Sequence, residues 1–516
     1  MAAKPELLEE VISTKTGINK DVLGLWRVKS RSVDARSKRV MVNLAIEIMD
    51  KGESFIQEDM PVYNALPADA PHVNIVGAGP AGLFAALRAI ELGWCPIVFE
   101  RGKDVDNRRK DLAQIARNDA VDPESNYCFG EGGAGTFSDG KLYTRSKKRG
   151  SVKDILMALH VHGANPEILV DAHPHIGTDK LPGIIKSIRE TIVNAGGKVN
   201  FSTRIDSLLI KGNVVEGVVT SAGDKYEGPV ILATGHSARD VYRMLDREGV
   251  DIEPKGIAIG VRLEHPQETI DRIQYHNPAG RGRWLPPAEY SFVCQVDGRG
   301  VYSFCMCPGG VIAPSATGPC QSVVNGMSSS SRGSRFANSG MVVEIHPEDF
   351  PEFEKYGNLR MLHLQESLES NFYQASGNSL NAPAQRMLDF VKGKISIDLP
   401  ATSYPPGIHS APVHFLLPDF ISSRLRKGFE VFGKKAKGFL TNDATVIGLE
   451  SRTSSPVRIP RKEDEMCHVR IANLYPAGEG AGYAGGIVSA AIDGRRCMDA
   501  LNDAFRKNCE PDNIEK

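Results

Sequence analysis

Apolar residues follow two different periods along the chain. Between residues 40 and 48 apolar and polar residues alternate, which predicts a strand with one buried face (Val40, Val42, Leu44, Ile46 and Ile48), and the earlier stretch PELLEEVI predicts a short helix. From residue 73 an apolar run is followed by apolar residues at helical spacing and then by a second apolar run at 97–99. This order of strand, helix and strand is typical of a parallel α/β sheet.

The composition of the sequence and its order of predicted strands and helices change at several points. These changes predict the domain bounds. Residues 1–65 are predicted as a small N-terminal α+β unit, and LPADAP at 66–71 as a linker. Residues 70–255 continue the alternation of strands and helices, whereas 256–465 mix strands, loops and helices. The stretch 326–340, rich in serine and glycine, is predicted to be a loop, and its composition suggests mobility or close approach to a ligand. We therefore expect an α/β fold with a Rossmann-like domain (70–255 plus 466–516), an inserted mixed α+β domain (256–465) and the N-terminal unit.

Composition narrows the class of protein. Of the 516 residues 41% are hydrophobic and 24% charged, as in ordinary globular proteins, and the formal net charge of -1 gives no overall attraction to nucleic acid or anionic membranes. The first residues lack a secretory signal, no run is long enough to span a membrane, and nine scattered cysteines do not look like a disulfide framework. We expect a cytoplasmic protein with reduced thiols.

The N-terminal unit is locally basic, with several cations around a single acid, Asp34. A patch that binds RNA or a protein partner is one interpretation, and a solvated strand face is the one we favour. The basic residues are Arg27, Lys29, Arg31, Arg36, Lys38 and Arg39.

Residues 77–82 carry G-x-G-x-x-G between a predicted strand and a predicted helix. Gly77 permits the tight turn, Gly79 lets a pyrophosphate approach the main chain, and Gly82 lets the helix pack closely on the strand. The helix N-terminus offers free N–H groups and a positive dipole end to the phosphates. Glu100, at the end of the next strand, can accept hydrogen bonds from a ribose. The motif with its context predicts a dinucleotide site.

The same glycine spacing recurs twice without this context. GEGGAG at 130–135 is not followed by an amphipathic helix, and GAGYAG at 480–485 opens a helix but has no second strand or acid after it. Neither stretch is predicted to be the phosphate turn of a strand–helix–strand unit.

Three motifs in order resemble the FAD-binding elements of flavoproteins of the glutathione-reductase and hydroxybenzoate-hydroxylase type. They are G-x-G-P-A-G with Glu100-Arg101, then VILATGH at 230–236, then LYPAGEGAGYAGGIVSAAIDG at 474–494, where Glu479 stands in place of the usual Asp. The resemblance implies FAD as the cofactor, with a helix from Gly486 pointing its N-terminus at the flavin. The cofactor-binding residues that it implies are Gly77, Gly79, Pro80, Ala81, Gly82, Glu100, Arg101, Arg109, Gly133, Gly135, Thr136, Ala233, Thr234, Gly235, Gly478, Glu479, Gly485, Gly486 and Ile487.

Further stretches resemble a bacterial and plastid family called FAD-dependent dehydrogenase-like proteins. They are 101–112, 125–145, 171–181, 303–310 and 448–459. The resemblance implies an FAD-dependent oxidoreductase with a discontinuous FAD-binding domain and a substrate domain at 256–465, and it implies no particular substrate. The expected reaction is hydride transfer between FAD N5 and a small organic molecule.

Two other functions stay open at this point. An NAD-dependent dehydrogenase would place NAD at the first glycine turn, although the C-terminal flavin motif would then have no use. A flavin-bound RNA-associated or scaffolding protein would use the basic N-terminal unit. Because no separate strand–helix–strand unit for a nicotinamide cofactor is visible, NAD(P)H would dock transiently, or a redox partner protein or the substrate would supply the electrons.

Two cysteines in SFCMCPGG raise a separate question. Cys305 and Cys307 alternate along a strand-like segment, so we expect both on one face, with the following Pro-Gly-Gly turn bringing this strand end to the flavin. A metal site shared with Cys294 and Cys320 would lack the usual ligand spacings. We also disfavour a flavin-linked disulfide, because strand geometry strains a Cys-x-Cys bridge. The expectation is that Cys305 or Cys307 lines the pocket and that neither binds a metal.

The remaining polar candidates concern catalysis. The stretch GGAGTFSDGKL is expected to place Ser138 and Lys141 beside the flavin N5 edge, and with Cys305 and Cys307 they are the candidate catalytic residues. His173-Pro-His175 is interpreted as a polar loop and not as a metal site.

Four arginines are candidate anion ligands. Arg109 and its neighbour Arg108 would hold a flavin phosphate or a substrate carboxylate, or else lie on a solvated helix face. Arg262 and Arg452 are candidate clamps for a substrate anion.

Overall fold

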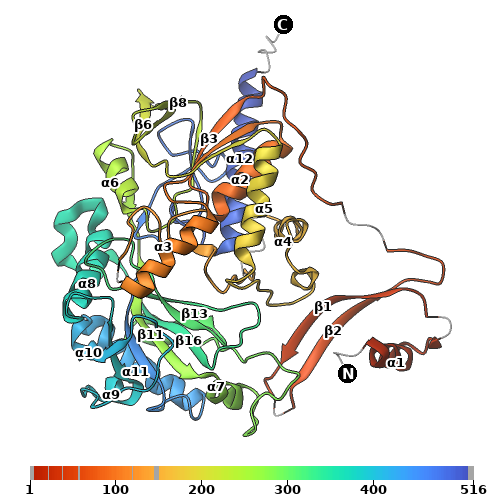
Figure 1. The fold of residues 1–516 in the computed structure, drawn as a ribbon, viewed down its shortest axis with the longest axis vertical. Helices are drawn as coiled ribbons and strands as arrows, with labels where there is room; N and C mark the ends of the chain where they lie inside the picture. Colours follow the sequence, from red (N-terminus) through yellow and green to blue (C-terminus); the bar gives the residue numbers. More distant parts are fainter. Residues whose placement is uncertain are drawn as a thin grey trace.

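A five-stranded parallel sheet forms one end of the molecule (Figure 1). The computed structural model describes residues 5–20, 23–37, 39–55, 59–118, 120–144 and 150–509. The sheet has the order β21–β9–β3–β4–β5, and all neighbouring strands are parallel. Parallel neighbours need crossover connections, so segments that are far apart in the sequence meet here. The strands are β3 (His72–Val76), β4 (Cys95–Phe99), β5 (Lys198–Asn200), β9 (Val230–Leu232) and β21 (Leu474–Pro476).

Both faces of the parallel sheet are covered. Alternate residues of β3 face opposite sides, so that Val73 and Ile75 pack under helices whereas Val76 packs toward an antiparallel sheet. Helices α2, α5 and α12 lie side by side on the first face, with α3 and α4 outside them (Figure 1). The elements are α2 (Pro80–Glu91), α3 (Val105–Asn118), α4 (Val152–Val161), α5 (Leu181–Asn194) and α12 (Ile487–Cys509), and on the second face β6 (Ile205–Lys211), β7 (Val214–Thr220), β8 (Lys225–Glu227) and α6 (Arg239–Arg247).

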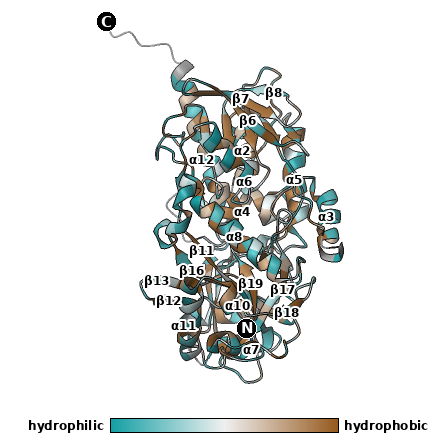
Figure 2. Cartoon of the chain, turned by 90° about the vertical axis from the view of Figure 1, so that its left-hand side faces the viewer, coloured by the Kyte–Doolittle hydropathy of each residue, from teal (hydrophilic) through white to brown (hydrophobic). Residues whose placement is uncertain are grey.

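A seven-stranded mixed sheet forms the other end of the molecule. Its order is β12–β13–β16–β11–β19–β17–β18, and its pairs are antiparallel except β17 with β18. Figure 2 shows its strands in brown beside helices whose outer turns are teal. The strands are β11 (Ile257–Pro266), β12 (Val293–Val296), β13 (Arg299–Cys307), β16 (Phe336–Ile345), β17 (Ala382–Arg386), β18 (Ile408–Ser410) and β19 (Thr445–Glu450).

Helices and two small ribbons surround this second sheet. Leu425, Phe429 and Phe432 of α11 are fully buried in its core. The helices are α7 (Gln267–Gln274), α8 (Arg360–Ala375), α9 (Met387–Lys392), α10 (Val413–Leu416) and α11 (Asp419–Lys435). The ribbons pair β14 (Val311–Pro314) with β15 (Val324–Met327) and β10 (Glu253–Pro254) with β20 (Val457–Arg458).

The coarse prediction of a mixed α/β protein is confirmed, and the exact domain bounds stay predictions. One local expectation is wrong. The stretch 326–340 was expected to be a loop, but its last five residues belong to β16 and pair with both β11 and β13. Strand pairing overrides the glycine and serine content here, because this strand is buried between two neighbours. None of the helices in the described part of the chain is long and apolar enough to cross a membrane.

The N-terminal unit consists of α1 (Pro5–Thr16) and a hairpin of β1 (Trp26–Asp34) and β2 (Met41–Ile48). Its basic residues largely pair with acids: Arg27 and Lys29 with Glu47, and Arg36 with Asp34. Arg31 pairs with Asp171, which lies outside the unit, at 2.7 Å. Arg39 is exposed, and Lys38 lies outside the described residues. These pairs favour the interpretation as a solvated face.

Candidate cofactor and active site

A cavity of about 370 Å³ lies between the C-terminal ends of the parallel strands and the second sheet. Loops that follow β3, β4, β9 and β21 line one part of it, and the end of β13 lines another. Ligands of open α/β sheets bind at this edge. The sequence-predicted residues on its wall are Gly77, Gly79, Pro80, Ala81, Glu100, Arg101, Gly133, Gly135, Ser138, Lys141, Ala233, Thr234, Gly235, Cys305, Arg452, Glu479, Gly485, Gly486 and Ile487.

The first glycine turn has three glycines with three different environments. Gly77 has a φ of +107°, and a Cβ there would lie 2.4 Å from the carbonyl oxygen of Ala233. A Cβ on Gly82 would lie 1.9 Å from the carbonyl oxygen of Gly77, so this glycine allows the helix to approach the turn and does not line the cavity. A Cβ on Gly79 would have only the Cα of Gly133, at 3.9 Å, nearby. Gly79 therefore leaves main chain open to the cavity, as a pyrophosphate requires.

The carboxylate of Glu100 lines the cavity and holds three main-chain groups. It accepts hydrogen bonds from the N–H groups of Ala78, Gly102 and Gly130, each at 2.9 Å. Two carboxylate oxygens offer about four acceptor positions, which leaves one for a ribose hydroxyl. The guanidinium of Arg101 stacks over Phe129 at 4.4 Å from the ring centre and is ion-paired, so it is held in a fixed orientation.

The second glycine-rich stretch lies directly on the first. The N–H of Gly132 donates to the carbonyl of Ala78 at 2.8 Å, and a Cβ on Gly133 would be 3.2 Å from the Cα of Gly79. Residues 133–135 form a short 3-10 turn on the cavity wall. Thr136, in contrast, is buried behind it and donates its hydroxyl to the carbonyl of Glu131. This stretch thus covers the phosphate turn and is not a second one.

The two neighbouring arginines of α3 have different roles from those expected. Arg109 is exposed and does not line the cavity, so its expected contact with a cofactor phosphate has no support in the structure. Arg108 is fully buried and donates to the carbonyls of Asn126 and Glu131, both at 2.8 Å. Burial lowers the pKa of its guanidinium to about 10. Arg108 therefore holds the glycine-rich loop in place.

The third glycine-rich stretch contributes one buried carboxyl and a helix N-terminus. Glu479 lines the cavity, and burial raises the pKa of its carboxyl to about 8 although Lys255 opposes the shift. A protonated carboxyl can both donate and accept a hydrogen bond, which suits hydroxyl groups. Gly478 does not line the cavity: a Cβ there would lie 2.8 Å from the Cβ of Ala81, so this glycine lets the segment that follows β21 approach α2.

A chain of ion pairs stands at the end of the cavity that faces the second sheet. Lys141 Nζ lies 2.9 Å from Asp139 and also contacts the carbonyl of Met306, and Arg332 lies 2.7 Å from Asp139. Burial raises the pKa of the Asp139 carboxyl, but the charges of Lys141 and Arg332 outweigh it and bring that pKa to about 2. Ser138 donates its hydroxyl to the carbonyl of Gly135 at 2.7 Å. Lys141 is thus a fixed positive charge on the cavity wall.

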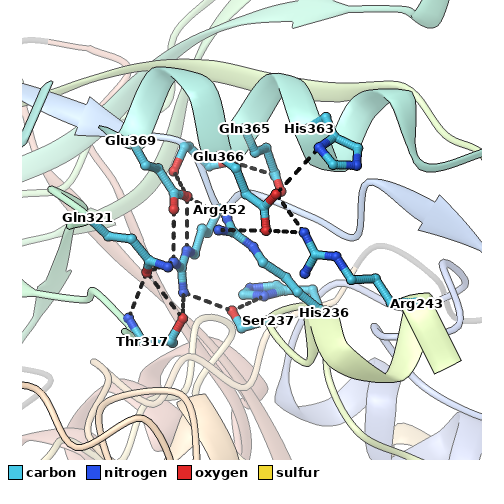
Figure 3. A network of polar contacts seen from close by, with 12 residues as sticks. His236, Ser237, Arg243, Thr317, Gln321, His363, Gln365, Glu366, Glu369 and Arg452 are labelled. Atoms are coloured by element: carbon cyan, nitrogen blue, oxygen red, sulfur yellow. Dashed lines mark hydrogen bonds and ion pairs between the residues drawn. The ribbon is translucent and has the colours of Figure 1, made fainter. Parts of the chain in front are cut away.

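The structure separates the two arginines expected to clamp a substrate anion. Arg262 is fully buried, outside the cavity wall, and is ion-paired with Glu450 at 3.1 Å, so its expected substrate contact has no support. Arg452 does reach the cavity wall, but its guanidinium is held by Glu369, Gln321 and Thr317 (Figure 3). Arg452 links the cavity to α8.

Sequence reasoning missed several residues of the cavity wall. His236 directly follows the ATG motif and lines the cavity. Its Nδ1 forms a hydrogen bond with the hydroxyl oxygen of Ser237, at 2.8 Å. Burial and the charges of Arg452 and Arg239 lower the pKa of its imidazole to about 4, so it is neutral. The sequence signal that could have identified His236 is its position directly after the motif residues Ala233–Gly235. Phe304 and Thr453 lie in the stretches 303–310 and 448–459 but were not singled out there, and Asn325 had no signal because no motif contains it.

His173 and His175 belong to a polar loop. His173 Nδ1 lies 2.8 Å from Glu289, and His175 Nε2 lies 3.2 Å from the carbonyl oxygen of Ser330. Among the residues that the structure describes, no group of three or more His, Cys, Asp or Glu side chains is arranged to hold a metal ion.

Two family models match parts of the chain. A family model described as "FAD-dependent protein, C-terminal domain-like" matches residues 256–453, and a model of a domain of unknown function matches residues 1–49. The structure of CtdE in complex with FAD is 12% identical, with a TM-score of 0.32, covering 85% of this chain and 89% of that one. A geranylgeranyl bacteriochlorophyll reductase-like protein from Thermoplasma acidophilum is 12% identical with a TM-score of 0.34, covering 85% and 80%.

One relative is similar over nearly the whole length. An uncharacterized protein from Clostridium beijerinckii is 38% identical over 518 residues, which is 97% of this chain and 96% of that protein. The chain belongs to the same family as this clostridial protein, a family of FAD-dependent proteins, and FAD is its cofactor.

Proposed function

We propose that this chain is an oxidoreductase in which hydride passes between FAD and a small organic substrate held between the two sheets. The observation that carries the proposal is the composition of the cavity wall. One end of the cavity is built from the glycine turns and Glu100, whereas the other is built from side chains of the second sheet and of the loop that carries Lys141. A cofactor whose nucleotide half lies at the glycines has its flavin half at the second sheet.

The residues present fit FAD. The open main chain at Gly79 and the N-terminus of α2 would hold the pyrophosphate, and Glu100 has an acceptor position left for the adenosine ribose. The protonated carboxyl of Glu479 would bind a ribityl hydroxyl, which supports the ribityl contact expected for this position. The N-terminus of α12, at Gly486 and Ile487, would face the flavin and stabilise negative charge on it.

The flavin, when bound, supplies two-electron hydride chemistry, and the protein supplies position and charge. Lys141 is a cation on the wall at the second sheet, where Arg452 is the other and is already held by Glu369, so we infer that Lys141 holds a negatively charged or polarised group of the substrate. The neutral imidazole of His236 and the amide of Asn325 are uncharged hydrogen-bonding groups on the same wall. These groups favour a polar, anionic substrate over an apolar one.

The test is anaerobic reduction of the purified, FAD-loaded protein. We expect the visible flavin band to bleach saturably with at least one organic donor or with NADH or NADPH, and Lys141→Met to slow that bleaching while FAD stays bound. A flavin that no donor reduces, and that after photoreduction passes its electrons to no organic acceptor, would contradict the proposal. Lys180→Met, which changes an exposed lysine, is the matched control.

The RNA-associated alternative is tested separately with the full chain. Because Arg27, Lys29, Arg31 and Arg36 are paired with acids, we expect no salt-dependent retention on RNA. Retention that falls steeply with salt and disappears with changes in this unit would favour the alternative.

A further inference from the structure

The end of β13 departs from a regular strand where its two cysteines stand. The pairing of β13 with β16 shifts register between Phe304 and Cys307, and Cys305 has a φ of +45°. Two residues of a regular strand would project on one face at a fixed separation. A bulge breaks that spacing. The strand geometry that disfavours a Cys-x-Cys bridge is therefore not the geometry of this site.

The two thiols differ in access but interact with each other. Cys305 lines the FAD cavity, whereas Cys307 is fully buried behind it, with its thiol 3.4 Å from the carbonyl oxygen of Cys305. A hydrogen bond from the Cys307 thiol, together with the charges of Lys141 and Arg262, lowers the pKa of Cys305 to about 5 despite its burial. The same bond and burial raise the pKa of Cys307. The pair is thus one thiolate and one thiol.

The surroundings stabilise that arrangement. Arg262 Nη2 donates to the carbonyl of Cys305 at 2.7 Å and lies 3.5 Å from the Cys307 sulfur. Lys141 contacts the carbonyl of Met306, the residue between the two cysteines. Two cations therefore hold the bulge and neutralise the thiolate, which is the environment of a reactive cysteine.

We propose that Cys305 and Cys307 form a dithiol–disulfide pair that exchanges two electrons with the FAD, with Cys305 as the thiol on the cofactor side and Cys307 as its buried partner. In the oxidising direction the S–H bond of Cys307 breaks and one S–S bond forms. The two electrons and the proton pass to oxidised FAD, which becomes the anionic two-electron-reduced form, so that charge and atoms balance. The inference deepens the proposed function, on which it rests, because it names a thiol pair as a redox partner within the same site.

The experiment is an anaerobic dithionite titration of the air-equilibrated, FAD-loaded protein. We expect the wild type to take up about four electrons per FAD, and Cys305→Ser and Cys307→Ser about two. Cys294→Ser, on the neighbouring strand β12 and outside the cavity, should keep the wild-type count. Since Cys307 is buried and its variant could fold poorly, the wild type is also unfolded in denaturant and labelled there with one alkylating reagent before reduction and a second one after it. The second label should appear on Cys305 and Cys307 and not on Cys320.

The outcomes separate this inference from the proposed function. About two electrons per FAD in the wild type, with both cysteines alkylated before reduction, would overturn the dithiol pair and leave the hydride reaction untouched. The full electron count with a flavin that no organic donor reduces would support the pair and contradict the proposed substrate reaction. A second label on Cys320 in place of Cys307 would assign a different partner and overturn the pair as proposed.

Discussion

The two ends of the cavity proposed to hold FAD use different chemical groups to position a ligand. At the nucleotide end the main chain does the positioning: Gly77 and Gly79 shape the turn, Gly133 lies on it, and the carboxylate of Glu100 holds three N–H groups around it. At the end that faces the second sheet, charged side chains do the positioning. Lys141, Asp139 and Arg332 form one chain of ion pairs, and Arg452 with Glu369 begins another.

This difference separates binding from reactivity. A main-chain site holds phosphate and ribose in the same way whatever the substrate is, because it uses groups that every residue has. The side-chain end sets local charge and pKa values, and its ion pairs also join the two sheets: Glu369 of α8 meets Arg239 of α6 and Arg452 after β19. A change at the first end should therefore affect FAD retention, and a change at the second end should affect stability or reactivity.

The largest expected effect is at the junction, from Glu369→Gln. The carboxylate of Glu369 is fully buried and accepts hydrogen bonds from Arg239, Arg452 and Ser451. Figure 3 shows Glu369 on α8 beside Arg452. Removing its charge leaves the buried guanidinium of Arg452 without its counter-ion and that of Arg239 with only the longer contact to Glu366, at 3.8 Å, which should lower the free energy of unfolding by about 3–5 kcal/mol. Denaturant unfolding of the two proteins measures this difference.

The matched control is Glu366→Gln on the same helix. Glu366 pairs with Arg243 at 2.7 Å in a partly exposed position, so its loss should cost less than about 1 kcal/mol.

The effect of Glu369 also depends on pH. Burial opposes ionisation, but Arg239 and Arg452 outweigh it and lower the pKa of Glu369 from 4.5 to about 2. Its stabilisation is therefore present above pH 4.5 and is lost as the pH falls through about 2. An equal cost for the two variants would contradict the assigned network.

At the nucleotide end, Gly77→Ala should cost both stability and FAD. Its φ of +107° is strained for alanine, and the new methyl group would lie 2.4 Å from the carbonyl oxygen of Ala233. We expect about 2–4 kcal/mol of destabilisation. Gly93→Ala is the control, because Gly93 has a φ of +83° with open space around it, and strain alone should cost about 1–2 kcal/mol. Melting curves measure the stability of the two variants, and FAD content after gel filtration measures how much cofactor they retain. Equal losses in Gly77→Ala and Gly93→Ala would show that the structure relieves the clash with Ala233.

Glu100→Ala should act mainly on FAD retention. The change removes a charge-assisted bond to the ribose, worth about 1–3 kcal/mol of FAD binding. It also leaves the N–H groups of Ala78, Gly102 and Gly130 without this acceptor, so the turn itself should loosen. Glu100→Gln keeps one acceptor oxygen and should lose less FAD affinity than Glu100→Ala. FAD titration of the depleted protein measures both, and undiminished affinity in Glu100→Ala would show that this carboxylate does not reach the ribose.

The same division explains what could be predicted from the sequence. The parallel sheet and the turn at Gly77 were predictable, because main-chain geometry requires glycines and short apolar runs at fixed spacing. The roles of Gly82 and Gly478 as packing positions follow from the same sterics, although only the first was assigned in advance. Arg109 was misplaced because α3 could present either of two adjacent arginines inward, and it buries Arg108.

The side-chain end was predicted only in part. Lys141 and Cys305 were expected beside the flavin, but the ion-pair partners Arg332 and Glu369 come from separate segments that no motif connects. The bulge in β13 was not predictable from its alternating pattern. It depends on the register with β16, and register is a property of two strands and not of one sequence segment.

The smallest expected effect comes from Lys141→Met, which should change the reactivity of Cys305 and leave FAD retention unchanged. This variant tests the difference between the two ends of the cavity most directly. Lys141 is the leading charge that lowers the pKa of Cys305 to about 5, after the hydrogen bond from Cys307. Without it we expect about tenfold less thiolate at a given pH below the new pKa, which corresponds to about 1.4 kcal/mol. The other ionisable groups that act on Cys305 stay in place: Arg262, Asp139, Cys307, Glu450 and Glu479.

The measurement is the rate of alkylation of Cys305 as a function of pH, followed by mass spectrometry. In the wild type the rate should rise through about pH 5 as the thiolate forms, and in Lys141→Met the rise should move to higher pH. Met is unbranched like Lys, one atom shorter and uncharged, and FAD affinity should stay within about twofold because the proposed phosphate and ribose contacts lie at the other end of the cavity. Lys180→Met should leave both quantities unchanged. If Lys141→Met released FAD without moving the pH profile, the cation would belong to the binding end, and the division between the two ends of the cavity would be wrong.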